Sequence, residues 1–350
     1  MDQIIRVGII GTGLSATMHV QALAAVPDVE VAAVAGTTPA KADAFAAEHG
    51  IPLAYDSVPR LLAEARVAAV HLCTPPFARE EYARLAASAG VHVLIEKPMA
   101  RDLAEADRII AACRVGGVRL GAQFQMRFMP LPWQIKRDLD EGRLGKIFLA
   151  DCYAKWWREP AYYAGSSWRG RLSGEGGAVL INQGIHSIDL LQWLAGSVRR
   201  LSARTATAVH DIEGEDLAVA TVEFASGAIG SIVASTATYP GFSERIELHG
   251  DRGTLILRQG EGVAEWYLKG AEPERVTAET QRNDSSRDPA KVSLVGHTAQ
   301  YADFYAALRS GRAPAIDGAE GRKALEIAKA IQLSSARGEP VSLPLEGSGG

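Results

Sequence analysis

The sequence predicts an α/β protein with an N-terminal doubly wound parallel sheet, a Rossmann domain at residues 1–122. An α+β domain with a large, mainly antiparallel open sheet is expected at 123–350. Three observations carry this prediction. Short apolar runs alternate with alanine-rich segments over the first third of the chain, which is typical of parallel strands joined by helices. A glycine-rich turn follows the first apolar run, and the later part shows alternating stretches joined by tight turns, which indicate hairpins.

The elements of the first domain follow from this rhythm. Buried parallel strands are expected at residues 4–10, 29–35, 67–73, 91–95 and 118–121. Helices are expected between them at residues 16–26, 39–49, 58–66, 79–89 and 103–115. The links are short, as in other doubly wound sheets.

The second domain is expected to mix helices with hairpins. Helices are predicted at residues 131–141, 178–194, 297–309 and 320–337. A long strand is predicted at 146–157, and hairpins pair 217–224 with 228–238 and 244–249 with 254–258. The polar segment 272–291 is expected to be a mobile loop, and residues 346–350 are of low complexity.

Composition narrows the class of protein. Hydrophobic residues make up 47% of the 350 residues and charged residues 22%, which is ordinary for a soluble protein of about two domains. The net charge of -4 gives no reason to expect nucleic acid or an anionic membrane as a partner. No apolar run approaches the ~20 residues of a membrane span, and no signal peptide is evident. The cysteines, Cys73, Cys113 and Cys152, fit reduced thiols, so we expect a cytoplasmic protein.

The glycine-rich turn is a candidate dinucleotide site. Gly11 permits a tight turn, Gly13 lets the backbone approach a pyrophosphate, and Ala16 allows close packing of helix on strand. The helix that begins here offers its N–H groups and positive dipole end to phosphates. We therefore expect Gly11, Gly13, Leu14, Ser15 and Ala16 to bind the cofactor.

The end of the second expected strand bears on the choice between NAD and NADP. An NAD site usually has Asp or Glu there to bind the ribose hydroxyls, whereas this chain has Gly36 followed by two threonines. Thr37 and Thr38 can bond a 2′-phosphate, and Lys41 adds positive charge. The alternative is an ordinary capped helix with a surface lysine. The sequence favours NADP, with NAD as the alternative, and predicts no metal.

Two further motifs point to catalysis. Lys97, in the run Glu96-Lys97-Pro98, ends a strand where open α/β sheets bind ligands. Asn182 and His186 are four residues apart in the expected helix 178–194, so they would share one face, and Asp189 could brace that face. Histidine is the side chain best suited to move a proton near neutral pH.

These residues give the chain a resemblance to the Gfo/Idh/MocA family of sugar and cyclitol oxidoreductases. The motifs are the fingerprint 11–16 with His19, Thr74-Pro75-Pro76, Glu96-Lys97-Pro98, Gln125-Met126-Arg127-Phe128, Trp168-Arg169, the segment 176–189, and the stretch from His297 through Asp303 to Gly338. The resemblance runs nearly end to end. The most specific part of the resemblance is Glu96-Lys97-Pro98 together with the glycine-rich bend at 174–177 and the pair Asn182 and His186 that follows it.

The resemblance implies roles for individual residues. Lys97 would orient the reacting hydroxyl and help to move its proton, His186 would be the other acid or base, and Asn182 would bond the reacting sugar oxygen. The resemblance also implies cofactor contacts for further residues: Thr74, Pro75, Pro76, Glu96, Lys97, Gln125, Trp168 and Arg169. It implies a cis bond before Pro98.

Two departures from the family pattern stand out. Members often have Asp at the position of Asn182, and an amide cannot act as a base. Many also have His after a Thr-Pro-Asn turn, where this chain has Pro76 and Arg79.

Aromatic and arginine side chains between these motifs suit a carbohydrate substrate. We expect Arg127 and Tyr163 to face the substrate together with Lys97, Asn182 and His186, whereas for Trp156 and Trp157 packing in the core or on the sheet surface is an equal alternative. The leading hypothesis is reversible hydride transfer between NAD(P) and a secondary alcohol of a sugar, sugar derivative or cyclitol. The alternatives are a cofactor-sensing regulator without catalysis and a ping-pong oxidoreductase that retains its cofactor. An uncovered sheet face would favour a homodimer or homotetramer.

Overall fold

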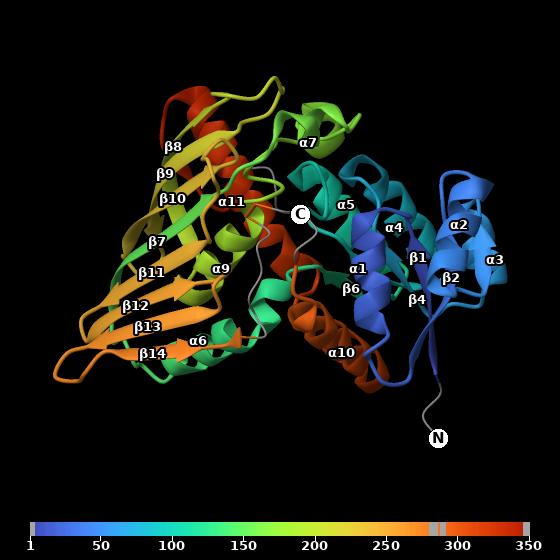
Figure 1. The fold of residues 1–350 in the computed structure, drawn as a ribbon, viewed down its shortest axis with the longest axis horizontal. Coiled ribbons are helices and arrows are strands. Elements are labelled where there is room, and N and C mark those ends of the chain that lie inside the picture. The colour runs from blue at the N-terminus through green and yellow to red at the C-terminus, as the bar shows by residue number, and fades with distance from the viewer. Residues whose placement is uncertain (1–3, 280–285, 288–291, 346–350) are drawn as a thin grey trace. The chain divides into compact units, whose positions relative to one another are not determined.

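The computed structural model describes residues 4–279, 286–287 and 292–345. The chain divides into two compact units (Figure 1). The first contains Met1–Gln125 and Leu294–Arg322, and the second contains Met126–Ser293 and Lys323–Gly350.

Six parallel strands form the sheet of the first unit, in the order β3-β2-β1-β4-β5-β6. The strands are β1 (Ile5–Ile10), β2 (Val29–Ala35), β3 (Leu53–Tyr55), β4 (Ala69–Leu72), β5 (His92–Ile95) and β6 (Leu120–Ala122). The helices between them are α1 (Leu14–Leu23), α2 (Pro39–His49), α3 (Val58–Glu64), the 3₁₀ turn η1 (Pro76–Ala78), α4 (Arg79–Ser88) and α5 (Leu103–Val115). The predicted doubly wound sheet is confirmed. The three-residue strand β3 was not expected, because so short a run carries no alternation.

Helix α10 (Val295–Ser310) belongs to the first unit, although the sequence placed it in the second domain. Its Tyr301, Phe304 and Tyr305 are fully buried in the same apolar core as Val7 and Ile9 of β1. Burying three aromatic rings outweighs closeness in sequence, since each ring removes a large apolar surface from water.

Nine strands form the sheet of the second unit, in the order β14-β13-β12-β11-β7-β10-β9-β8-β15. They are β7 (Ile147–Lys155), β8 (Val198–Ala206), β9 (Leu217–Phe224), β10 (Ile229–Ser235), β11 (Arg245–Gly250), β12 (Gly253–Arg258), β13 (Val263–Leu268), β14 (Glu274–Thr277) and β15 (Val341–Ser342). Neighbouring strands are antiparallel except β7 and β10, which run parallel. Both predicted hairpins are present. The prediction of a mobile loop at 272–291 is wrong at residues 274–277, which form β14. Residues 280–285 and 288–291 of that segment lie outside the part of the chain that the structure describes.

The remaining elements of this unit are mostly short. They are the 3₁₀ turn η2 (Gln125–Phe128), which begins at the unit boundary, α6 (Pro130–Asp140), α7 (Pro160–Ala164), α8 (Leu172–Glu175), α9 (Ile185–Ala195) and α11 (Gly318–Arg337), which begins in the first unit. Figure 1 shows α6 and α9 on one face of the sheet. Within the described ranges no helix has both the length and the apolar character needed to cross a membrane.

A buried ion pair attaches α9 to the segment before α6. Arg127 donates from Nε to Oδ2 of Asp189 over 2.8 Å and from Nη2 to Oδ1 over 2.6 Å. Asp189 is fully buried, and 3% of Arg127 is exposed. The guanidinium also lies 5.5 Å from the ring centroid of Trp193. This bidentate pair sets the orientation of α9, which carries His186.

Removing one partner of this pair is expected to destabilise the protein strongly. Arg127→Met leaves a buried carboxylate without its counter-charge and should lower the free energy of unfolding by about 3–5 kcal/mol. The double variant Arg127→Met/Asp189→Leu should recover most of that loss, because apolar residues often replace buried ion pairs without cost. Urea unfolding of the native protein, the single variants Arg127→Met and Asp189→Leu, and the double variant measures the coupling. An Arg127→Met variant as stable as the native protein would contradict it.

A second buried acid lies just before β11. Glu244 is 3% exposed. Burial raises the pKa of Glu244 to about 7, although its own backbone amide and the charge of Arg158 act in the opposite direction. The folded protein therefore holds this proton more tightly than the unfolded chain.

This shift gives the protein a pH-dependent stability. Below the unfolded pKa of 4.5 the carboxyl is protonated in both states. As pH rises from there to about 7, only the unfolded chain ionises, so the free energy of unfolding falls by about 3 kcal/mol and then levels off. Glu244→Gln should therefore be more stable than the native protein at about pH 8 and similar to it at about pH 5. Glu261→Gln, at an exposed site, is the control. A difference that does not vary with pH would refute this account.

Candidate active site

The glycine-rich turn lies where the strand order of the first sheet reverses, between β1 and β4, the usual ligand site of such sheets. Gly11 has a φ of 116°, and a Cβ there would lie 2.7 Å from the carbonyl oxygen of Cys73. Only glycine fits both the conformation and the space.

The start of α1 offers free amide groups. A Cβ on Gly13 would meet no atom within 4 Å, and no side chain caps this helix. Leu14 and Ser15 open its first turn, and Ala16 is fully buried against the sheet. Unsatisfied N–H groups at a helix start bind phosphate well. These residues fit the pyrophosphate of a dinucleotide.

A side chain at Gly36, at the end of β2, would be crowded by α2. A Cβ there would lie 3.0 Å from the backbone nitrogen of Ala42. Thr38 caps α2, because its Oγ1 accepts the N–H of Lys41 over 3.3 Å. Thr37, Thr38 and Lys41 are all exposed. The capped-helix alternative therefore accounts for the hydroxyl of Thr38, while Thr37 and Lys41 face solvent.

The loop after β4 contains a polar atom that a ligand could satisfy. Thr74 Oγ1 is buried without a hydrogen-bond partner among the described residues. Pro75 and Pro76 follow it, and Pro76 begins η1. A buried hydroxyl without a partner is uncommon in proteins, so this position fits contact with a bound group.

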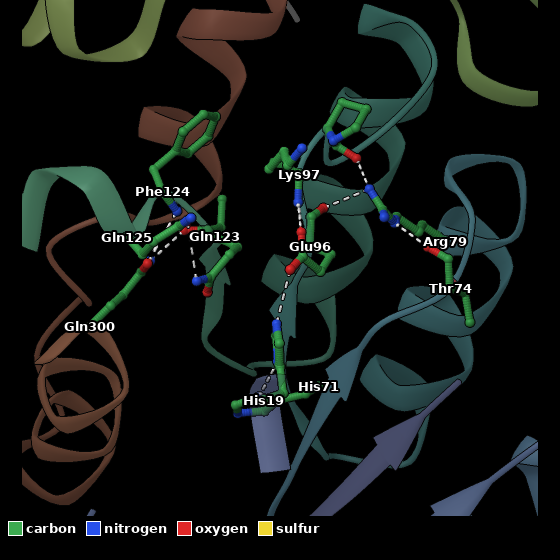
Figure 2. A network of polar contacts seen from close by, with 12 residues as sticks. His19, His71, Thr74, Arg79, Glu96, Lys97, Gln123, Phe124, Gln125 and Gln300 are labelled. Carbon is green, nitrogen blue, oxygen red and sulfur yellow. Dashed lines mark hydrogen bonds and ion pairs between the residues drawn. The ribbon is translucent and has the colours of Figure 1, made fainter. Parts of the chain in front are cut away.

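Lys97 follows β5 with one residue between, and the peptide bond between Lys97 and Pro98 is cis, as the resemblance implied. The Lys97 side chain is partly buried. The carboxylate of Glu96 turns back into the unit: Oε2 accepts the N–H of Lys97 over 2.9 Å, and Oε1 lies 3.0 Å from Nε2 of His19 (Figure 2). Burial alone would raise the pKa of Glu96, but the His19 bond and the charges of His19, Lys97 and Arg79 hold that pKa well below its usual range.

A chain of hydrogen bonds extends from this carboxylate. His19 Nδ1 lies 2.8 Å from His71 Nδ1, and His71 Nε2 lies 2.7 Å from the hydroxyl of Tyr305. Burial lowers the pKa of His71 and raises the pKa of Tyr305. A neutral His71 ring has one nitrogen that donates and one that accepts, so it can link the Tyr305 hydroxyl to His19. His19 belongs to one of the sequence motifs, whereas His71 and Tyr305 belong to none, because the alignment of these side chains depends on three separate elements.

Glutamines hold the strand end beside this turn. The backbone N–H of Gln123 donates to Ile95 over 2.9 Å. Gln300 of α10 accepts from the backbone of Phe124 over 3.1 Å and donates to the carbonyl of Ala122 over 2.7 Å. Gln125, a predicted cofactor contact, is 8% exposed, and its Oε1 lies 3.5 Å from Nε2 of Gln123. A cofactor role for Gln125 stays a prediction.

In the second unit the predicted helix 178–194 is wrong at its start, because α9 begins at Ile185. Turns precede it, and their amide groups bond elsewhere. The backbone N–H groups of Ala178 and Leu180 both donate to Oε1 of Glu215 over 3.1 Å. A carboxylate from a distant part of the chain thus binds the backbone of the turns that precede α9.

Asn182 and His186 therefore do not share a regular helix face, although both are partly buried. Asn182 Nδ2 donates to the carboxylate of Glu175 and lies 3.4 Å from the hydroxyl of Tyr162. Arg127 binds the carboxylate of Asp189, the residue that was expected to brace the face of His186. Glu175 and Tyr162 were not predicted as site residues, because their spacing in the sequence gave no indication of contact with Asn182.

Two of the residues expected to face a substrate, Arg127 and Tyr163, have structural partners. The Arg127 guanidinium is paired with the carboxylate of Asp189. This pairing does not favour the predicted contact between Arg127 and a substrate. Tyr163 is 6% exposed, and its hydroxyl lies 2.8 Å from Thr236 Oγ1. Its side chain also lines a cavity of about 530 Å³ within this unit, together with Arg169 and His210.

Arg169 lies among aromatic rings. Its guanidinium carbon is 4.7 Å from the ring centroid of Tyr162 and 5.1 Å from that of Trp168. Its Nε is buried and has no hydrogen-bond partner among the described residues. The cofactor contacts that the resemblance implies for Trp168 and Arg169 stay predictions. In the described ranges, no group of three or more His, Cys, Asp or Glu side chains could hold a metal ion.

Comparison with known proteins identifies the family. Residues 5–124 match a family described as "Oxidoreductase family, NAD-binding Rossmann fold", and residues 136–343 match its "C-terminal alpha/beta domain". The chain is 28% identical to 1,5-anhydro-D-fructose reductase of Ensifer adhaerens (97% of this chain, 98% of that one). It is 26% identical to myo-inositol 2-dehydrogenase of Thermotoga maritima (94% and 96%).

A solved structure agrees with these sequence matches. The WlbA dehydrogenase from Bordetella pertussis, in complex with NADH and UDP-GlcNAcA, is 31% identical, covers 98% of this chain and 100% of its own, and has a TM-score of 0.85. Both family domains, in order and over almost the whole length, show that the chain belongs to the Gfo/Idh/MocA family of oxidoreductases.

Proposed function

We propose that the protein transfers a hydride between a nicotinamide cofactor and a secondary alcohol or ketone carbon of a sugar, sugar derivative or cyclitol. The observation that carries this proposal is the turn at Lys97. Lys97 follows β5, and its backbone N–H donates to the buried carboxylate of Glu96. Lys97 thus stands at the end of the sheet where cofactors bind. The named relatives that act on anhydrofructose and inositol support the substrate class.

The protein supplies orientation and proton transfer. When bound, the cofactor supplies the hydride chemistry. Lys97 would hold the reacting hydroxyl and take or return its proton. A lysine pKa of ~10.4 is too high for a base at neutral pH unless a nearby positive charge lowers it. If Lys97 stays charged, His186 is the base and Lys97 stabilises the developing alkoxide. Asn182 can bond a substrate oxygen but cannot accept the proton.

Two alternatives remain testable beside this proposal. A cofactor-sensing regulator would bind the cofactor without turning over any substrate. A ping-pong oxidoreductase would keep its cofactor, and the purified protein would then show nicotinamide absorbance. The hydrogen bonds that hold the backbone around Lys97 support catalysis, because a sensor has no need for a lysine fixed at this position.

We also propose that the protein forms homodimers or homotetramers through the outer face of the nine-stranded sheet. Val219 and Ile229 on that face are 46% and 59% exposed. A cavity of about 540 Å³ opens beside Ile229 and Ser231. Exposed apolar side chains on a large sheet favour association with another copy.

Replacing Lys97 is expected to abolish turnover without loss of cofactor binding. The substrate is found first, by following reduction of NAD and NADP across free sugars, inositols, sugar acids and nucleotide sugars. Lys97→Ala should then lower kcat by about 10²–10⁴-fold, the range for a positioned acid or base. Its dissociation constant for the reduced cofactor, from fluorescence titration, should change little. Lys146→Ala, at an exposed site, is the control. Turnover that survives in Lys97→Ala would refute the proposed role.

The cofactor is proposed to be NADP(H) in preference to NAD(H). The absence of an acid at Gly36, where a Cβ would crowd Ala42, and the exposed Thr37 and Lys41 support this. Thr37→Asp adds a negative charge at the ribose end and should weaken NADP binding about tenfold relative to NAD. Thr37→Asn is the uncharged control of the same size. Much tighter binding of NAD than of NADP by the native protein would overturn the preference.

A further inference from the structure

Arg79 is a buried arginine that bonds backbone carbonyl groups. It is the first residue of α4, and 5% of it is exposed. Its Nε donates to the carbonyl of Thr74 over 2.9 Å, and its Nη1 donates to the carbonyl of Glu96 over 2.8 Å and also to that of Pro98 (Figure 2). One guanidinium thus joins the loop after β4 to the turn after β5.

The peptide group before Lys97 is consequently held at both ends. Its carbonyl, which belongs to Glu96, accepts from Arg79. Its N–H, which belongs to Lys97, donates to the Glu96 carboxylate. The next carbonyl that Arg79 bonds belongs to Pro98, on the other side of Lys97. The backbone on both sides of Lys97 is therefore fixed by hydrogen bonds from one charged side chain.

Arginine suits this arrangement better than any other side chain. A guanidinium has five N–H donors in a rigid plane, whereas an imidazole can donate only two and a lysine amine donates from a single atom. Hydrogen bonds that involve a charged group are also stronger than neutral ones. The buried positive charge of Arg79 is balanced by Glu96, whose pKa it helps to lower.

We propose that Arg79 is a positioning residue for Lys97. It fixes the backbone on both sides of Lys97, so that the amine is aimed before substrate arrives. This inference rests on the proposed catalytic role of Lys97. Misplacing a reacting group by ~1 Å can cost ~10²-fold in rate, so the main consequence of losing Arg79 falls on kcat rather than on cofactor affinity.

The test uses three variants of the full-length protein. Arg79→Ala removes the guanidinium, and Arg79→Lys keeps the charge but not the planar fork. Arg84→Ala, at an exposed site on the same helix, is the matched control. For each protein we would measure kcat and KM for the substrate, the dissociation constant of the reduced cofactor, and the thermal midpoint.

The expected result is a loss of rate that a small molecule can repair. Arg79→Ala should lose about 10²-fold in kcat, with a much smaller change in cofactor affinity, and Arg79→Lys should lose less. Guanidinium chloride added at low, non-denaturing concentration should restore part of the rate in Arg79→Ala and none in Lys97→Ala. Arg84→Ala should match the native protein. If Arg79→Ala does not fold, the reduced kcat of a folded Arg79→Lys carries the test.

Failure of this inference can be distinguished from failure of the proposed function. Full turnover in Lys97→Ala would refute the role of Lys97 and this inference with it. Loss of turnover in Lys97→Ala together with native kcat in Arg79→Ala and Arg79→Lys would refute the positioning role alone. Loss of rate in Arg79→Ala that guanidinium does not rescue, with a parallel fall in cofactor affinity and thermal midpoint, would assign Arg79 to stability only.

Discussion

The ionised carboxylate of Glu96, buried at the end of β5, is the constraint on which the candidate site depends. A carboxylate removed from water is strongly unfavourable unless it is paired and hydrogen-bonded. This one receives the N–H of Lys97 and a bond from His19, with the charge of Arg79 nearby. The structure around it can be understood as the set of donors that keep it charged, and the orientation of Lys97 follows from that set.

The same constraint explains why α10 packs with the first unit. Tyr305 on α10 completes the chain that runs through His71 and His19, and Gln300 on the same helix bonds the backbone at the end of β6. A helix that follows strands β7 to β14 of the second sheet in sequence therefore supplies polar groups to the first unit. Polar networks in low dielectric are strong when every member has a partner and unfavourable when one lacks it. The packing of α10 in the first unit thus gives polar groups hydrogen-bond partners and also buries aromatic rings.

Local chemistry made much of the fold predictable from sequence. The apolar runs located five strands of the first sheet, and the tight packing around Gly11 and Gly36 agrees with the turn and strand end inferred there. Short strands such as β3 and β15 gave no signal, since two or three residues cannot show alternation. The start of α9 was misplaced, and sequence spacing gave no indication that Glu215, more than thirty residues later, binds the amide groups of the preceding turns.

The candidate site was less predictable than the fold, because a residue type does not reveal its partner. The sequence identified Lys97 by its place after a strand, and Gly11 and Gly13 by the geometry that glycine alone allows. It gave no means of knowing that Arg127 would bind Asp189 or that Arg79 would bond three carbonyl groups. Pairings between distant residues are set by the tertiary fold.

Arg79 and Arg127 stabilise the structure around them in the same way. Each is almost completely buried, and each uses its planar set of donors to fix backbone or helix position rather than to reach solvent. Arg127 orients the helix that carries His186, and Arg79 bonds the backbone on both sides of Lys97. Guanidinium groups remain charged under all ordinary conditions, so both side chains keep their hydrogen-bond donors as the pH changes. The proposed proton transfer at Lys97 or His186 would therefore leave the surrounding positions fixed, which the proposed reversible hydride transfer requires in both directions.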